Sequence, residues 1–427
     1  MSVTGTDTNR TIEAVWRIEA PRLIAGLVRL VRDVGLAEEL AQDALVAALE
    51  QWPRDGVPDN PGAWLTAVAR RRAIDLFRRN ERLEEKLQTI AHQDAAEPDS
   101  TEAAIEAAIE EDLGDDLLRL MFIACHPILS PEARVALTLR LLGGLSTQEI
   151  ARAFLVAEPT VAQRIVRAKK TLADARIPFE LPPPAERAAR VSSVLEVIYL
   201  IFNEGYAATA GDDWMRVELC EDAMRLGRVL AGLLPDEPEV HGLVALMEIQ
   251  ASRMRARVGP SGEPVLLLDQ DRGRWDHLLI GRGLAALERA ERLGGDGPYV
   301  LQAQIASCHA RARTAEETDW GRIAVLYDAL ASVLPSPIVE LNRAVAVSMS
   351  RGPEAALPIV DALRDEPVLA SYHLLPSVRG DLLAKVGRFD EAAFEFERAA
   401  TLTQNEPERS LLRERAAACA RGVAPVR

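Results

Sequence analysis

Residues 130–177 carry the most restrictive pattern in the chain, because helical stretches alternate there with short, well-marked breaks. A helical run ends at a Gly-Gly pair, and Ser146 with Glu149 three residues later forms a capping box that begins a short helix. The turn LVAE then leads to Pro159, which is well tolerated in the first turn of the next helix. The pattern predicts a helix-turn-helix motif.

The second helix of this motif is polar and basic along one face. Thr160, Gln163, Arg164, Arg167 and Lys170 fall on that face at helical spacing. In helix-turn-helix proteins the second helix lies in the major groove, where side chains near its start reach base edges and later basic ones hold phosphates. The pattern therefore favours DNA binding. The alternative is a pair of packed helices with a solvated basic face.

Charge divides the first part of the chain into modules. Residues 70–82 hold six arginines and two acidic residues, and residues 160–177 hold five basic residues and one acidic residue, so each segment has a net charge of +4. Between them, residues 83–116 hold twelve acidic residues and one lysine. We expect two basic helical modules, 1–82 and 117–180, joined by an acidic flexible linker over 83–116.

The first module contains two further helical patterns. Residues 39–52 are strongly amphipathic, and residues 61–79 begin with proline and become basic toward their end. Arginines beside Trp64 suit single-stranded DNA, whose phosphates pair with cations and whose bases stack on aromatic rings. The alternatives are a tryptophan in the core and a solvated face with ion pairs within the helix.

After a proline-rich hinge, residues 181–427 read as helices joined by Gly/Pro turns. The similar elements GPEAA and GRFDEAA begin at Gly352 and Gly387, 35 residues apart, close to the tetratricopeptide period of about 34 residues. Small residues at Ala392 and Ala393 would let two helices approach closely. We expect an α-solenoid of tetratricopeptide type, whose concave surface would suit a protein or peptide partner.

Composition supports an all-α chain. Aromatic residues make up 4% of the sequence, and Ala, Leu, Glu and Arg are abundant. A net charge of −15 excludes a uniformly basic nucleic-acid coat but leaves local basic patches open. Four scattered cysteines without a C-x-x-C pair fit a reducing compartment. With no secretory signal in the polar start and no bilayer-length apolar run, we expect a cytoplasmic protein that does not bind membranes.

The two basic modules, in this order, resemble regions 2 and 4 of bacterial sigma factors of the extracytoplasmic-function (ECF) group. EELAQDALVAALEQWP is similar to the helix with which these factors bind the clamp of RNA polymerase. The resemblance implies that Glu39, Gln42 and Asp43 face core RNA polymerase.

PGAWLTAVARRRAID is similar to the family's helix that opens and reads the −10 element of promoter DNA. On this resemblance the DNA-contacting residues of the first module are Trp64, Arg70, Arg71, Arg72 and Asp75. Many members of the family carry Asn at the position of Arg71.

EPTVAQRIVRAKKTL is similar to the recognition helix of region 4, which reads the −35 element. The resemblance assigns Thr160, Gln163, Arg164 and Arg167 to DNA contacts. Leu155 stands in the turn where glycine is usual, and Ala162 stands where lysine is frequent. The resemblance covers residues 10–180; the rest resembles the tetratricopeptide-like extension of one group of these factors, including its blocks at 199–206 and 269–276.

No sequence pattern indicates catalysis, a metal or a cofactor, so we expect a protein that is not an enzyme. The segment DQDRGRWD, with Asp269, Asp271, Asp276 and Trp275, is unusual. It could be an effector pocket, part of a catalytic dyad, or a turn whose charges pair with one another or hold a helix end. Asn203 and Glu204 are expected to make hydrogen bonds at a helix end.

The sequence therefore predicts a promoter-specific sigma factor of RNA polymerase whose extension regulates it in cis. The alternative is a helix-turn-helix regulator with a ligand- or partner-sensing repeat domain that never joins the polymerase.

Overall fold

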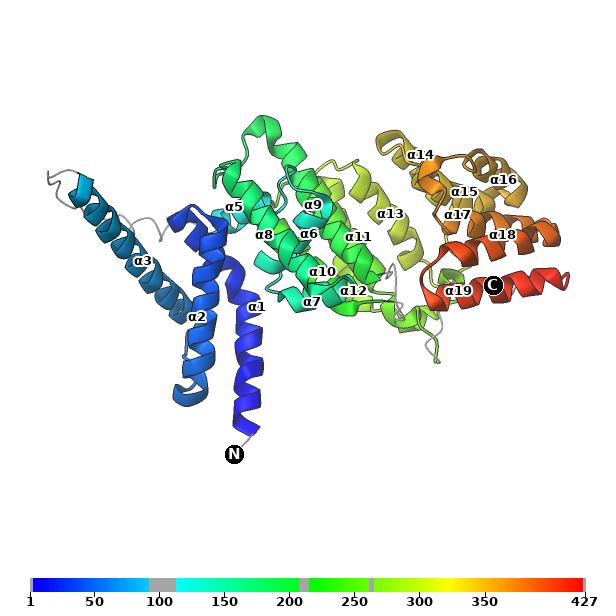
Figure 1. The fold of residues 1–427 in the computed structure, drawn as a ribbon. Coiled ribbons are helices and arrows are strands. Elements are labelled where there is room, and N and C mark those ends of the chain that lie inside the picture. Colours follow the sequence, from blue (N-terminus) through cyan, green and yellow to red (C-terminus); the bar gives the residue numbers. More distant parts are fainter. Residues whose placement is uncertain (1–2, 92–112, 207–214, 261–264, 425–427) are drawn as a thin grey trace. The chain divides into compact units, whose positions relative to one another are not determined.

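The computed structural model describes residues 3–91, 113–206, 215–260 and 265–424, and these residues form helices and loops without a β-strand. They divide into two compact units, Met1–Ile198 and Tyr199–Arg427 (Figure 1). The all-α prediction is confirmed. No helix in the described ranges combines the length and hydrophobicity that a bilayer crossing requires.

Unit 1 contains the two basic modules. Helix α1 packs on α2, α3 and α5, and α8 packs on α6 and α7. Large apolar side chains such as Ile24, Leu65, Leu120 and Leu137 are fully buried in this unit. Its helices are α1 (Val3–Val31), α2 (Val34–Asp55), α3 (Pro61–Ala91), α5 (Leu113–Ala124), α6 (Pro131–Leu141), α7 (Thr147–Ala153), α8 (Glu158–Asp174) and the first part of α9 (Pro184–Tyr206).

The predicted acidic linker is helical at both of its ends. Helix α3 continues to Ala91 because Glu, Leu, Lys and Gln are good helix formers. Helix α5 begins at Leu113 and places Asp116, inside the predicted linker, in a fully buried position. Asp116 is bound there by Arg29, at 3.3 Å, and by Arg119, at 2.7 Å. Helices α3 and α5 therefore extend into the two ends of the predicted linker, and residues 92–112 lie outside the described part of the chain.

The helix-turn-helix motif forms as predicted. Ser146 Oγ accepts the Glu149 backbone N–H at 3.1 Å, and the Glu149 carboxylate accepts the Ser146 N–H at 2.7 Å. In the following turn Leu155 has φ of 49°, a left-handed conformation that normally favours glycine. The turn therefore keeps its geometry although its glycine is missing.

The first half of α9 packs with the helix-turn-helix module. Buried Arg134 of α6 donates to Ser193 Oγ at 2.7 Å and pairs with Glu196 at 2.8 Å. Arg190 donates to the Phe122 carbonyl at 2.6 Å. The first compact unit consequently ends at Ile198, beyond the boundary at residue 181 that the proline hinge indicated.

In unit 2, successive helices pack on their neighbours in chain order, as in a solenoid (Figure 1). Helices α17 and α18 approach closely where Gly380 meets the ring of Phe396 and the Ala392 carbonyl, so Ala392 has the predicted packing role. The tetratricopeptide assignment stays a prediction. After α9 come α10 (Val217–Leu233), α11 (Pro238–Ala251), α12 (His277–Arg292), α13 (Pro298–Arg311), α14 (Trp320–Val333), α15 (Pro337–Arg351), α16 (Pro353–Ala362), α17 (Leu374–Lys385), α18 (Phe389–Leu402) and α19 (Glu406–Ala420).

Candidate polymerase and nucleic-acid interface

Helix α8 is amphipathic. Its inner face is buried through Val161, Ile165, Ala168 and Leu172. The predicted DNA-contacting residues lie away from that face: Arg164 is half-buried, and Thr160, Gln163, Arg167 and Lys170 are exposed. Within the described part of the chain, the three cationic side chains of this set make no ion pair. Helix α8 therefore presents free positive charge beside hydrogen-bonding groups near its start, as reading of a DNA groove requires.

The side of α8 toward α2 carries a different kind of contact. Lys169 pairs with Glu38 of α2, and Arg140 of α6 binds the same carboxylate at 2.5 Å. Glu38 is only 5% exposed. The two basic modules of unit 1 are thus joined through one buried carboxylate with two cationic partners, a role that sequence reasoning missed.

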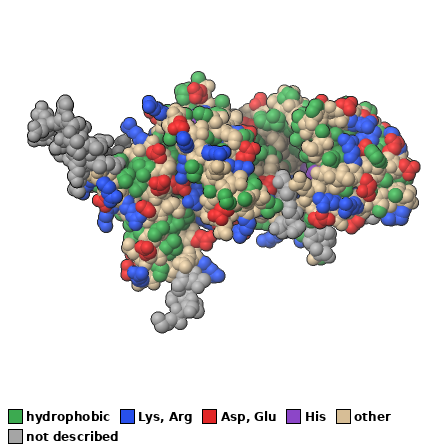
Figure 2. Space-filling view, viewed as in Figure 1, with side chains coloured by type: hydrophobic (Ala, Val, Ile, Leu, Met, Phe, Trp, Pro, Cys, Tyr) green, Lys and Arg blue, Asp and Glu red, His purple; other side chains and the backbone are tan. Residues whose placement is uncertain are grey.

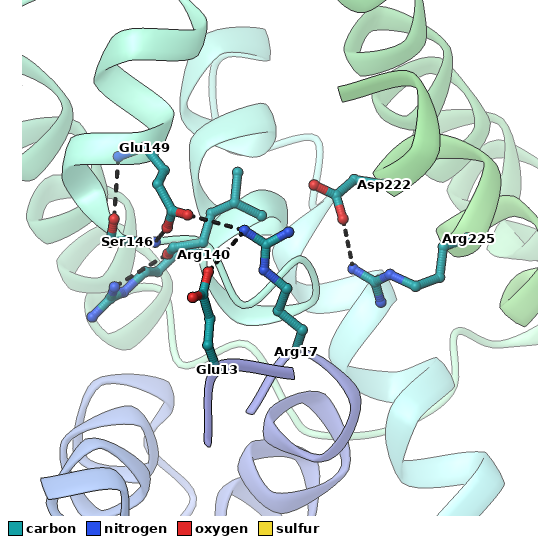
Figure 3. A network of polar contacts seen from close by, with 8 residues as sticks. Glu13, Arg17, Arg140, Ser146, Glu149, Asp222 and Arg225 are labelled. Carbon is teal, nitrogen blue, oxygen red and sulfur yellow. Dashed lines mark hydrogen bonds and ion pairs between the residues drawn. The ribbon is translucent and has the colours of Figure 1, made fainter. Parts of the chain in front are cut away.

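A second ionic contact joins the same modules nearby. Figure 3 shows Arg17 of α1 reaching toward Glu149 of α7, at 3.0 Å, and toward Glu13 of its own helix, at 3.5 Å. Glu149 also completes the capping box, and its pKa is lowered although burial opposes this, because Ser146 and Arg17 hydrogen-bond to the carboxylate. Glu149 therefore both begins α7 and holds α1 against it.

The predicted polymerase-binding residues lie on α2. Glu39 and Asp43 are exposed, and Gln42 is half-buried. Asp43 pairs with Arg72 of α3 at 2.9 Å. The structure thus brings together one residue predicted to bind polymerase and one predicted to bind DNA.

On α3 the predicted residues occupy different environments. Trp64 is half-buried and packs edge-to-face on buried Trp52, with ring centroids 5.3 Å apart. Arg71 and Asp75 are exposed, and no ion pair joins them among the described residues. Arg70 lines a cavity of about 580 Å³ between α1 and α3.

The DQDRGRWD segment of unit 2 is a structural turn. Asp271 accepts the Gly273 N–H at 2.9 Å, and Asp276 caps α12 by accepting the Leu278 and Leu279 N–H groups. Its arginines bind backbone: Arg272 donates to the carbonyls of His309 and Ala312, each at 2.7 Å, and to Thr318 Oγ1 at 2.9 Å, while Arg274 donates to the Arg255 carbonyl. The interpretation as a turn that holds a helix end is confirmed.

The block at 199–206 likewise makes its contacts at a helix end, the C-terminal end of α9. Glu204 pairs with Arg216, which precedes α10. Gly205 lies so close to the next helix that a Cβ would come within 2.8 Å of the Arg216 carbonyl and the Cys220 nitrogen. The interpretation of Glu204 as a helix-end residue is therefore confirmed.

On the visible surface, basic and acidic side chains are interspersed, without a uniformly basic face (Figure 2). The four cysteines are buried and free. The described residues contain no group of three or more His, Cys, Asp or Glu side chains that could hold a metal ion.

Three families match successive parts of the chain. Residues 16–83 match Sigma-70 region 2, residues 119–172 match Sigma-70, region 4, and residues 190–291 match a family of unknown function, DUF6596. The last match includes both the 199–206 block and the 269–276 turn.

Two relatives extend this result. An uncharacterized protein of Rhizobium meliloti (strain 1021), R00370, is 44% identical over 398 residues, which is 92% of each chain. The probable ECF RNA polymerase sigma factor SigI of Mycobacterium tuberculosis is 29% identical over 178 residues, 41% of this chain and 59% of that protein. No solved structure matches the chain significantly.

Region 2 followed by region 4 along the chain defines a sigma factor of the sigma-70 class. More particularly, the chain belongs to the ECF type with a C-terminal helical extension, and it shares a family with R00370 over nearly its whole length.

Proposed function

We propose that this sigma factor binds core RNA polymerase through Glu39, Gln42 and Asp43, opens the −10 element with α3 and reads the −35 element with α8. The observation that supports this proposal most strongly is the cationic face of α8, whose side chains make no ion pair among the described residues. The preceding helix, α7, begins with a complete capping box, which fixes the start of the helix-turn-helix motif. Its exposed polar residues can reach base edges while Arg167 and Lys170 hold phosphates.

Reading both elements requires the two modules to separate. Elements centred roughly 25 base pairs apart lie about 85 Å apart along B-DNA. Here Glu38 of α2 contacts both Arg140 and Lys169, so the modules touch. We propose that the Glu38 pairs break when polymerase and promoter are bound, and that the structure corresponds to the closed form of the factor.

We further propose that the extension regulates transcription in cis. Residues 199–427 form a compact unit of their own that is longer than unit 1. Its two unusual sequence blocks hold helix ends and turns, which supports a role through surface and shape rather than through catalysis.

Pull-down of core polymerase with Asp43→Arg tests the polymerase assignment, and loss of binding is expected. Because Asp43 also pairs with Arg72, the charge-swapped double variant Asp43→Arg/Arg72→Asp is the matched control. The swap restores the internal pair but not the carboxylate that faces polymerase, so it should still fail to bind. Rescue by the swap would mean that the ion pair, and not a polymerase contact, matters.

In-vitro transcription tests the regulatory role. The truncated chain should end after Ile198, because a chain ending at the proline hinge loses Ser193 and Glu196, the partners of buried Arg134. Core binding should persist and transcription should differ clearly from that of the full chain. Equal output from both chains contradicts regulation in cis, and failure of the full chain to bind polymerase favours the helix-turn-helix regulator.

A further inference from the structure

Unit 2 contains a cavity of about 560 Å³ that the proposed DNA and polymerase contacts do not use. Its walls come from the loop before the 269–276 turn and from α14, α15, α16, α17 and α19. Most of the wall is apolar, including Leu266, Leu267, Trp320, Val345, Met349 and Leu382. This volume and this lining are typical of sites for small organic molecules.

One buried hydroxyl in the wall has no partner. Ser348 of α15 is 7% exposed, and its Oγ makes no hydrogen bond. Other helical serines of the unit donate to a carbonyl three or four residues back: Ser350 to Ala346 at 2.9 Å, Ser307 to Gln304 at 2.7 Å and Ser332 to Ala329 at 2.6 Å. Because an unpaired buried hydroxyl is costly, Ser348 is suited to a hydrogen bond with a molecule in the cavity.

Charged groups gather at one part of the same wall. Asp381 is bound by Lys385 at 2.8 Å and by Arg415 at 2.6 Å, so two cations face one carboxylate. The Arg415 guanidinium also lies over the Phe396 ring, at 4.6 Å, and its Nε is buried without a hydrogen bond. The other acidic residue of the lining, Asp269, is exposed to solvent. The cluster around Arg415 thus keeps one positive charge in excess and one free donor.

We infer that this cavity binds a small organic acid with an apolar body. The carboxylate lies at Arg415 and Lys385, where charge-assisted hydrogen bonds are strong. The Ser348 hydroxyl supplies a further hydrogen bond, and the body packs on Trp320 and Met349. This goes beyond the proposed function, because such binding needs neither polymerase nor promoter DNA.

Calorimetric titration of the full-length protein tests the site. The probes are octanoate, phenylacetate and indole-3-acetate, which separate straight-chain from aromatic acids, with octanol and octylamine as matched uncharged and cationic probes. We expect at least one acid to bind saturably with one molecule per chain. Octanol and octylamine should bind at least about tenfold more weakly than octanoate, because they lack the anionic group.

Variants locate the bound acid. Ser348→Ala should weaken binding about fivefold, whereas Ser350→Ala, on the same helix with its hydroxyl satisfied and exposed, should leave it unchanged. Arg415→Gln should weaken it more than about tenfold. Arg415 also pairs with Asp381, so its replacement could alter the fold. Met349→Trp is therefore a second variant, which fills the cavity and leaves every charged residue in place. Val368→Trp, at a position that is 72% exposed, is its control.

Met349→Trp should abolish binding and Val368→Trp should not, with both variants giving the circular dichroism spectrum of the unaltered protein. The inference is overturned if no acid binds below about 10 mM, if octanol binds as tightly as octanoate, or if folded Met349→Trp binds as the unaltered protein does.

Discussion

The arginines of α8 and those of the 269–276 turn both belong to charged motifs that the sequence marks as candidate sites, but they have opposite environments. Arg164 and Arg167 make no ion pair among the described residues, and their helix turns only its apolar side into the core. Arg272 and Arg274 instead donate to backbone carbonyls from neighbouring segments. An arginine whose donors are already satisfied holds the fold, whereas one with free donors is available to a ligand.

This difference cannot be seen in residue types. Both motifs mix Arg with acidic or polar residues. What separates them is that backbone carbonyls at the end of a neighbouring helix lie within reach of Arg272. Arg272 lies beneath the end of α13, where the last carbonyls of a helix lack partners within the helix.

Arg272→Ala should lower the free energy of unfolding of the protein by about 3 kcal/mol, because the carbonyls of His309 and Ala312 and the Thr318 hydroxyl lose their donor. Arg164→Ala should change it by less than about 0.5 kcal/mol. Urea unfolding of full-length variants measures both, with exposed Arg282→Ala as the control in unit 2. Similar small effects of Arg272→Ala and Arg282→Ala would contradict the structural role of the turn.

The turn also influences a buried histidine. Burial, with Arg253 and Arg272 nearby, lowers the pKa of His309 from 6.5 to about 3. Between pH 6.5 and pH 3, His309 therefore binds a proton in the unfolded chain but stays neutral in the folded protein. The free energy of unfolding consequently decreases as the pH falls through this range. Between pH 7.5 and pH 5.0 the loss from this group should be about 2 kcal/mol.

His309→Phe should remove this part of the acid sensitivity and keep an edge-to-face contact like the one with Trp320, where the ring centroids lie 5.1 Å apart. Unfolding free energies of the two proteins at pH 7.5 and 5.0 provide the measurement. The variant His277→Gln, at an exposed histidine, is the matched control for the loss of an imidazole. An unaltered slope in His309→Phe would show that the ring titrates normally in the folded protein.

On α8, the comparison predicts effects on DNA binding rather than on stability. Arg164→Ala should cost about 1–3 kcal/mol of promoter binding and relax selectivity at one or two positions of the −35 element. Lys170→Ala should weaken binding to all promoters alike. It should also lower the slope of the logarithm of the binding constant against the logarithm of the salt concentration by about one. Binding to a panel of −35 variants at several salt concentrations separates the two. If binding by the two variants depended on the −35 sequence in the same way, α8 would lie outside the major groove.

Local signals were predictable from the sequence, and contacts between distant segments were not. The capping box of Ser146 and Glu149 lies within four residues, so its spacing fixed the start of α7. The role of Glu38 depends on Arg140 and Lys169, more than a hundred residues away, and no periodicity links them. The Asp43–Arg72 pair was missed for the same reason. The end of α3 is not predictable from charge alone, because an acidic composition is typical of disordered segments although Glu, Leu, Lys and Gln also form helices well.

The smallest predicted effect concerns Leu155, at the turn that presents α8. Its φ of 49° places a branched side chain in the left-handed region, which costs roughly 1–2 kcal/mol for residues other than glycine. The side chain is 54% exposed, so its removal sacrifices little packing. Leu155→Gly should therefore stabilise the protein, by about 0.5–1 kcal/mol after the larger chain entropy of glycine is included. Leu155→Val, branched at Cβ, should destabilise it, and promoter binding by both variants should stay unchanged. Urea unfolding and promoter titration check these outcomes; destabilisation by glycine would mean that Leu155 makes a packing contribution larger than its strain.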